Sequence, residues 1–89
     1  MIKHQITIIN KLGLHARAAA KLAKTSSQFS SSIKIGSQHS LVDGKSVMSL
    51  MLLAASKGTA LEIICDGQDE DRALEAITHL IDDRFGEGE

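Results

Sequence analysis

Residues 10–24 read NKLGLHARAAAKLAK, and within this stretch a loop gives way to a helix. Before it, from Ile2 to Ile8, apolar and polar residues alternate, which is typical of a strand with one covered face. The segment from Asn10 to Gly13 breaks that alternation and is predicted to be a loop. From Ala16 onward the residues are strong helix formers, and the serines that follow are expected to end the helix. One helix face is small and is predicted to be buried: Ala19, Leu22, Ala23 and Ser26.

Two further helices are predicted in the second half of the chain. Ser46 is placed to cap a helix over residues 47–55, which the cation and glycine of Lys57-Gly58 should close. A last amphipathic helix has an apolar face that runs from Ala73 to Phe85. Its acidic start, residues 69–71, is expected to be solvated, and the tail GEGE after Phe85 is expected to be frayed.

Short apolar runs at residues 33–35, 41–42 and 60–65 predict three more strands, the first two joined by a hairpin loop at 36–40. The order of elements is then β-α-β-β-α-β-α within 89 residues. This length allows one domain, residues 1–89, and is too short for two. The expected fold class is α+β, with one sheet and its helices packed on one face.

The composition argues against a general nucleic-acid-binding protein. Ten Lys and Arg residues stand against eleven Asp and Glu, whereas such proteins usually carry a basic excess. The two aromatic residues, Phe29 and Phe85, provide no stacking platform for single strands.

The sequence also indicates a cytoplasmic protein. No apolar stretch approaches the about 20 residues that span a bilayer, and the N-terminus lacks the features of a secretory signal. The single cysteine, Cys65, cannot form an internal disulfide and lies in a predicted strand, where a buried structural thiol is expected.

The segment from Gly13 to Arg17 is the main candidate for chemistry. His15 follows a loop glycine and directly precedes a helix, so its ring is expected near the unpaired N–H groups of the first turn. These groups and the helix dipole favour an anion such as phosphate, and Arg17 adds a cation that can bind phosphoryl oxygens in a bidentate manner. A neutral imidazole ring could attack a phosphoryl donor. The alternative is that His15 only caps the helix.

Two segments resemble a known family. Residues 13–22, GLHARAAAKL, closely resemble the active-site segment of the HPr family, the histidine-containing phosphocarriers of the bacterial phosphotransferase system. Residues 45–51, KSVMSLM, resemble the regulatory-serine region of that family, and Lys57-Gly58 with the strand after it also matches. The resemblance covers essentially the whole chain. One departure is Ala18, where the family usually has proline after the arginine.

The resemblance implies an open-faced β-sandwich in which a four-stranded antiparallel sheet lies under three helices. It implies that His15 accepts a phosphoryl group on Nδ1 from phosphorylated enzyme I and passes it to a histidine of an enzyme IIA domain, with help from Arg17. The protein is then expected to be a monomeric carrier rather than an enzyme, with no bound metal or organic cofactor.

The resemblance further implies that Ser46 is phosphorylated by HPr kinase/phosphorylase. A phosphate there would add about −1.5 to −2 charges beside a helix start. As an N-cap, however, Ser46 needs no regulatory role. The helix that follows is too apolar to be buried all round, so Val47, Met48 and Met51 are predicted to form a docking surface for enzyme I and enzyme IIA.

Three alternatives remain open from the sequence. A carrier of the nitrogen-related phosphotransfer branch would use His15 in the same way. A regulatory module would act through phospho-Ser46 and engage a transcription factor, but it would not need His15. An unrelated small α/β scaffold could have a histidine that caps its helix.

Overall fold

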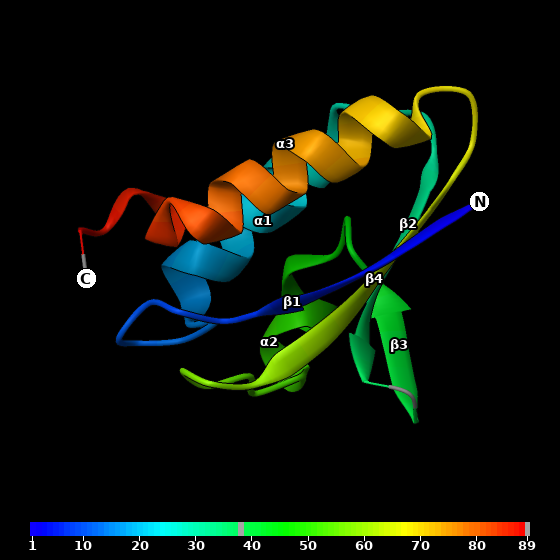
Figure 1. Cartoon of the computed structure of the whole chain (residues 1–89). Helices are drawn as coiled ribbons and strands as arrows, with labels where there is room; N and C mark the ends of the chain where they lie inside the picture. The colour runs from blue at the N-terminus through cyan, green and yellow to red at the C-terminus, as the bar shows by residue number, and fades with distance from the viewer. Residues whose placement is uncertain (38, 89) are drawn as a thin grey trace.

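A computed structural model describes residues 1–37 and 39–88, which form a four-stranded sheet and three α-helices. Figure 1 shows how these elements are arranged. The predicted order of elements is confirmed. The elements are β1 (Ile2–Thr7), α1 (Ala16–Ser27), β2 (Ser32–Ser37), β3 (Ser40–Asp43), α2 (Val47–Leu52), β4 (Ala60–Asp66), α3 (Glu70–Asp82) and a short 3-10 helix η1 (Arg84–Gly86). The predicted loop at 36–40 is shorter than expected, since β2 extends to Ser37 and β3 begins at Ser40; Gln38 lies outside the described residues.

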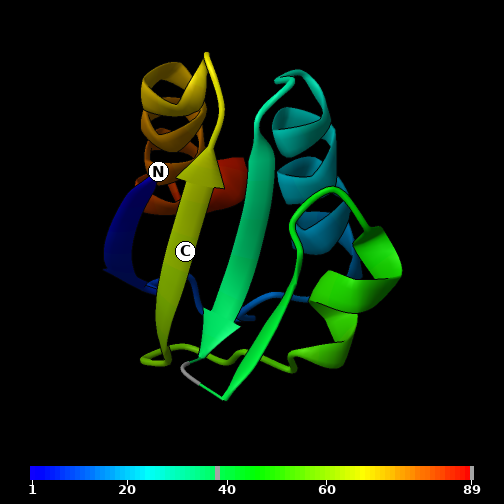
Figure 2. The same cartoon turned by 90° about the vertical axis from the view of Figure 1, so that its right-hand side faces the viewer.

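The sheet has the strand order β1-β4-β2-β3, and all three pairings are antiparallel. The last strand in the chain, β4, therefore lies between β1 and β2. Its apolar residues face apolar partners, with Leu61 opposite Ile6 and Ile63 opposite Ile35. Helices α1 and α3 lie on one side of the sheet, and α2 lies beside α1 near β3 (Figure 2). This arrangement confirms the predicted α+β open-faced sandwich.

Helix α1 buries the small face that its sequence pattern predicts. Ala19, Leu22, Ala23 and Ser26 are buried, and Ala18 is fully buried beside them. The helix ends at Ser27, within the serine-rich stretch, as expected. Small side chains allow a close approach of α1 to its neighbours, and the helix contacts both α2 and the C-terminal turn η1.

Helix α2 is shorter than predicted, because it ends at Leu52 and not near Lys57-Gly58. Ala54 adopts a left-handed conformation with φ of 50°, which directs the chain out of the helix. The carbonyl of Ala55 then accepts a hydrogen bond from the Leu14 N–H at 2.8 Å. Gly58 belongs to the loop that follows, where its N–H bonds the Ile8 carbonyl at 2.7 Å.

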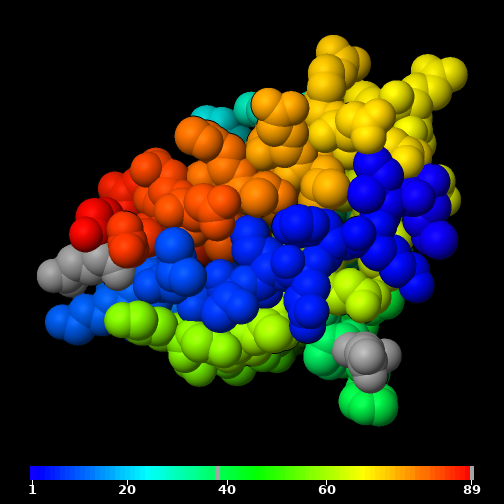
Figure 3. Space-filling view, viewed as in Figure 1, coloured from blue at the N-terminus to red at the C-terminus, as the bar shows by residue number. Residues whose placement is uncertain are grey.

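The C-terminal segment differs most from the prediction. Helix α3 ends at Asp82, so Phe85 is not on its apolar face. Arg84 and Phe85 both have left-handed backbones, with φ of 53° and 54°, and the chain turns out of the helix. Phe85 is buried in the core at this turn, and the Lys21 Nζ donates a hydrogen bond to its carbonyl at 2.6 Å. The tail is described as far as Gly88, and Glu89 lies outside the described residues. Residues 86–88 are not frayed: Asn10 bonds Glu87, so this segment lies against the loop before α1, at one end of the molecule (Figure 3).

The acidic start of α3 makes specific bonds, although it was expected to be solvated. The Asp69 carboxylate accepts the backbone N–H groups of Ser30 and Ser31 at 2.9 and 3.0 Å, and also the Ser31 hydroxyl. Glu70 accepts the N–H of Gly67 at 3.1 Å. Asp69 thus ties the start of α3 to the segment that enters β2. The Ser31 and Ser30 hydrogen bonds lower the pKa of Asp69 from 3.8 to about 2.

This shift predicts an acid-dependent loss of stability. Because the folded-state pKa of Asp69 is depressed, its contribution is complete above the ordinary pKa and is lost as the pH falls toward 2. We expect the urea midpoint of the parent protein to fall more steeply between about pH 5 and about pH 2 than that of Asp69→Asn. Asp71→Asn, at an exposed neighbouring position, should behave like the parent. If the urea midpoints of the parent and of Asp69→Asn fell in parallel with pH, the Asp69 carboxylate would not be the source of the acid-dependent loss of stability.

Candidate functional site

The loop before α1 is held by backbone contacts that set the position of His15. Gly13 has φ of +69°, a left-handed conformation that glycine adopts without a steric penalty. A Cβ at this position would lie 2.5 Å from the Ala55 carbonyl oxygen. The next residue, Leu14, is buried and donates its N–H to that same oxygen. The loop therefore packs directly on the segment that follows α2.

His15 occupies the N-cap position of α1, as predicted. Its backbone is extended, with φ of −79° and ψ of 179°, and its carbonyl accepts the first helical bond from the Ala19 N–H at 2.8 Å. Its ring makes no capping hydrogen bond to any described backbone amide. The side chain is 26% exposed. The interpretation of His15 as a side-chain cap is therefore not supported.

The His15 ring instead contacts the tail. Its Nε2 is hydrogen-bonded to a carboxylate oxygen of Glu87, a residue 72 positions later in the chain. The other Glu87 oxygen accepts a hydrogen bond from Asn10 Nδ2 at 2.9 Å, and the same nitrogen bonds the Gly13 carbonyl at 2.8 Å. Asn10 is fully buried. The loop, the ring and the tail are thus joined through one amide group and one carboxylate.

Glu87 has a partly buried side chain, 13% exposed. Burial alone would raise the pKa of its carboxyl group, but the hydrogen bonds from Asn10 and His15 outweigh burial. The pKa of Glu87 therefore lies below its ordinary value, and the group is a carboxylate near neutral pH.

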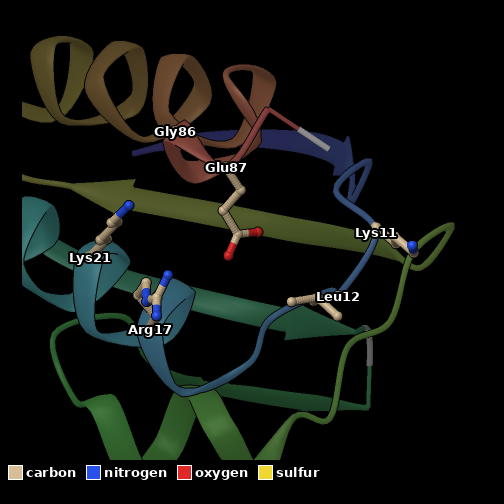
Figure 4. Close-up of a pocket in the computed structure, with 6 residues that line it drawn as sticks. All are labelled: Lys11, Leu12, Arg17, Lys21, Gly86 and Glu87. Atoms are coloured by element: carbon tan, nitrogen blue, oxygen red, sulfur yellow. The ribbon is translucent and has the colours of Figure 1, made fainter.

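A shallow pocket opens beside this contact and is rich in cations. Figure 4 shows Arg17 and Lys21 on α1, with Lys11 and Leu12 from the loop across from them and the Glu87 side chain pointing in from the tail. Arg17 is exposed, so its guanidinium can reach an anion in the pocket. The structure thus places Arg17 at a pocket whose tail residue contacts His15.

Ala18 fits the first turn of α1 without distortion of the helix. The residue is fully buried, and the helix runs without interruption from Ala16 to Ser27. The methyl group of Ala18 lies where the family that the sequence resembles usually has proline. A proline would have fixed φ and removed one amide donor, whereas alanine keeps that donor in the helix start.

The second predicted segment lies on α2, which packs beside α1. Ser46 is its N-cap, as predicted, and its hydroxyl accepts a hydrogen bond from the Ser49 N–H at 3.2 Å. Leu50 is the fully buried residue of the helix. The predicted docking residues are all exposed, at 39%, 74% and 45%: Val47, Met48 and Met51. Leu52 is exposed to an even larger fraction, 79%, and extends this apolar surface.

Four charged or polar residues near the site were missed from the sequence. Asn10 and Lys11 were interpreted only as loop residues, Lys21 only as part of a helix, and Glu87 as part of a frayed tail. A buried asparagine three residues before a site glycine carries no distinct local signal. Glu87 has none either, since its partners lie 72 and 77 residues away. Across residues 1–37 and 39–88 we find no group of three His, Cys, Asp or Glu residues that could hold a metal, and no helix long and apolar enough to cross a membrane.

Comparisons with known proteins agree with the fold and show the family of the chain. A family model described as the PTS HPr component phosphorylation site matches residues 2–83. A phosphocarrier protein HPr from Neisseria meningitidis serogroup A is 55% identical over 89 residues, which cover all of both chains. A phosphocarrier protein NPr from Shewanella violacea is 43% identical and covers 97% of this chain and 94% of its own. A crystal structure of HPr from Thermoanaerobacter tengcongensis has a TM-score of 0.93 and 41% identity, over 98% of both chains.

The close approach at Gly13 predicts that Gly13→Ala destabilises the fold. A left-handed alanine costs about 1–2 kcal/mol, and the contact with Ala55 adds to it, so we expect a loss of at least about 2 kcal/mol in the free energy of unfolding. Gly58→Ala is the control, because Gly58 is also left-handed but a Cβ there would meet no described atom within 4 Å. Equal losses in urea titrations of the two variants would show that the contact with Ala55 has no effect.

Proposed function

Because the chain belongs to the HPr family of phosphocarrier proteins, we propose that it carries a phosphoryl group on His15. The group is accepted on Nδ1 from phosphorylated enzyme I, which phosphoenolpyruvate charges, and is passed to a histidine of an enzyme IIA domain. The observation that supports this most is the position of His15, which is partly exposed at a helix start. Its ring contacts Glu87, and Glu87 lines a pocket rich in cations. In this proposal the protein is a monomeric cytoplasmic carrier rather than an enzyme, and it serves sugar uptake and its regulation.

The local chemistry suits a transient phosphoryl group. A helix start presents unpaired N–H groups and the positive end of the helix dipole. Arg17 can hold two phosphoryl oxygens in a fork, while Lys11 and Lys21 add charge from two sides of the pocket. Together they stabilise the negative charge of the phosphorylated state.

The exposed face of α2 is proposed to bind enzyme I and enzyme IIA domains. Val47, Met48 and Met51 lie on a helix that packs beside α1, and contiguous exposed apolar side chains are typical of protein interfaces. Methionine side chains adapt readily to different partners, which suits a carrier that must dock with a donor and then with an acceptor.

A carrier of the nitrogen-related branch is the second candidate. Its chemistry at His15 would be the same, and a relative named phosphocarrier protein NPr is found among the matches. The higher identity to a relative named HPr favours the sugar branch. Phosphotransfer assays with the enzyme I and enzyme IIA proteins of each branch would discriminate between the two.

We predict that incubation with enzyme I and phosphoenolpyruvate adds one acid-labile phosphoryl group per chain, and that His15→Ala abolishes this. Intact-mass spectrometry before and after acid treatment measures the product. His79→Ala is the control, since it removes an exposed histidine from α3. An unchanged yield in His15→Ala would overturn the assignment.

Ser46 is proposed as a regulatory site for HPr kinase/phosphorylase. A negative charge at this N-cap would lie directly before the apolar residues Val47 and Met48. Since a carboxylate can still cap a helix, the charge should disturb the docking surface more than the fold.

We therefore expect Ser46→Asp to slow phosphoryl transfer from enzyme I by about tenfold, or about 1.4 kcal/mol, with an unchanged melting temperature. Ser46→Asn is the matched control, because it retains a capping side chain of the same shape without the charge. Equal rates for the two variants would remove the case for regulation by charge at this position.

A further inference from the structure

The contact between Glu87 and His15 is built into the fold and is not a chance approach of a loose tail. Phe85 is buried two residues before Glu87, and Lys21 binds its carbonyl. On the other side, Asn10 holds one Glu87 oxygen at 2.9 Å. The carboxylate is therefore fixed from both the core and the loop, and its second oxygen faces the His15 ring.

The contact decides which ring nitrogen carries the proton. A carboxylate only accepts hydrogen bonds, so Nε2 must donate. In a neutral imidazole the other nitrogen then holds the free electron pair. That nitrogen is Nδ1, and the tail thus selects the form of the ring in which Nδ1 is the nucleophile.

We propose that Glu87 is a positioning residue for phosphoryl transfer, which fixes the His15 ring in its Nε2–H form and balances the charge that develops on the ring. This inference rests on the proposed function of His15. Asn10 supports Glu87, because its Nδ2 bonds both the carboxylate and the Gly13 carbonyl and so sets the tail relative to the loop. The arrangement parallels the carboxylate that orients histidine in hydrolase triads.

The transfer step is balanced without a proton leaving Nδ1. The Nδ1 electron pair forms the new bond to phosphorus while the bond from phosphorus to the donor breaks, and its electron pair stays on the donor. The ring then carries a positive charge, with its proton on Nε2 still donated to Glu87. In the onward step the electron pair of a ring nitrogen of the acceptor histidine forms a bond to phosphorus while the bond from Nδ1 to phosphorus breaks. The pair of the broken bond returns to Nδ1, and the His15 ring regains its starting form.

Electrostatics alone predicts an opposite effect, in which Glu87 slows phosphoryl transfer. Glu87 lines the pocket together with the cations Lys11, Arg17 and Lys21. A carboxylate there competes with an incoming phosphoryl group for those cations. The observed bond to the ring nitrogen, together with the buried amide that holds the carboxylate, favours positioning, and the experiment below separates the two effects.

The test compares Glu87→Gln with Glu75→Gln, which removes the same charge from an exposed position of α3. A glutamine side chain can either accept a hydrogen bond from Nε2–H or donate one to an unprotonated Nε2. The substitution therefore removes the preference for the Nε2–H tautomer but keeps the shape of the side chain. Nitrogen chemical shifts of His15 in the unphosphorylated protein report the two tautomers. A time course with enzyme I and phosphoenolpyruvate, in which samples are quenched at set times, gives the rate of phosphoryl transfer to His15.

We expect nearly all of the neutral ring in the parent and in Glu75→Gln to be in the Nε2–H form, and a mixture of both forms in Glu87→Gln. The transfer rate should fall about tenfold in Glu87→Gln only, at the low end of losses seen when a group that orients a histidine is removed. A second variant, a chain that ends at Gly86, should show the same two changes. Because it has no residue at position 87, its changes cannot come from a new contact made by glutamine.

Faster transfer in Glu87→Gln would show that the tail competes with the phosphoryl group, and this would overturn the proposal. An unchanged tautomer ratio, or an unchanged rate, would overturn it as well. If the parent itself is not phosphorylated on His15, the proposed function fails. The tautomer comparison does not involve phosphorylation, so it would still show whether Glu87 sets the form of the ring.

Discussion

The hydrogen bond from the Leu14 N–H to the Ala55 carbonyl joins the two segments on which the site depends. It requires glycine at position 13, because a side chain there would collide with the same carbonyl. It also requires the chain to leave α2 early, and Ala54 does so with a left-handed backbone. The position of His15 at the helix start and the shortness of α2 are thus two results of one close backbone contact.

This contact also connects the two candidate functional residues. Ser46 caps a helix of six residues, and soon after the end of that helix comes the carbonyl that supports the His15 loop. A change at the start of so short a helix lies less than two turns from its end. The proposed regulatory site at Ser46 and the proposed phosphoryl site at His15 therefore share a structural support, although a surface charge alone would suffice to affect the proposed docking.

Local patterns allowed most of the fold to be predicted. The alternation in β1, the small buried face of α1 and the capping role of Ser46 depend on residues within four positions of one another, and such spacing is visible in a sequence. The partners of Glu87 and Asp69 lie 38 to 77 residues away, and no periodicity marks them. For the same reason His15 and Arg17 could be predicted as a pair, whereas Asn10 and Glu87 required the structure.

The strand order has a consequence for how the chain acquires its structure during synthesis. β4 is the last strand to leave the ribosome, yet both β1 and β2 depend on it for hydrogen bonds. Until residue 66 has emerged, the nascent chain can form the local β2–β3 hairpin, but β1 exists only as an unpaired edge. Folding of the sheet is therefore governed by non-local contacts and must follow translation of about three quarters of the chain.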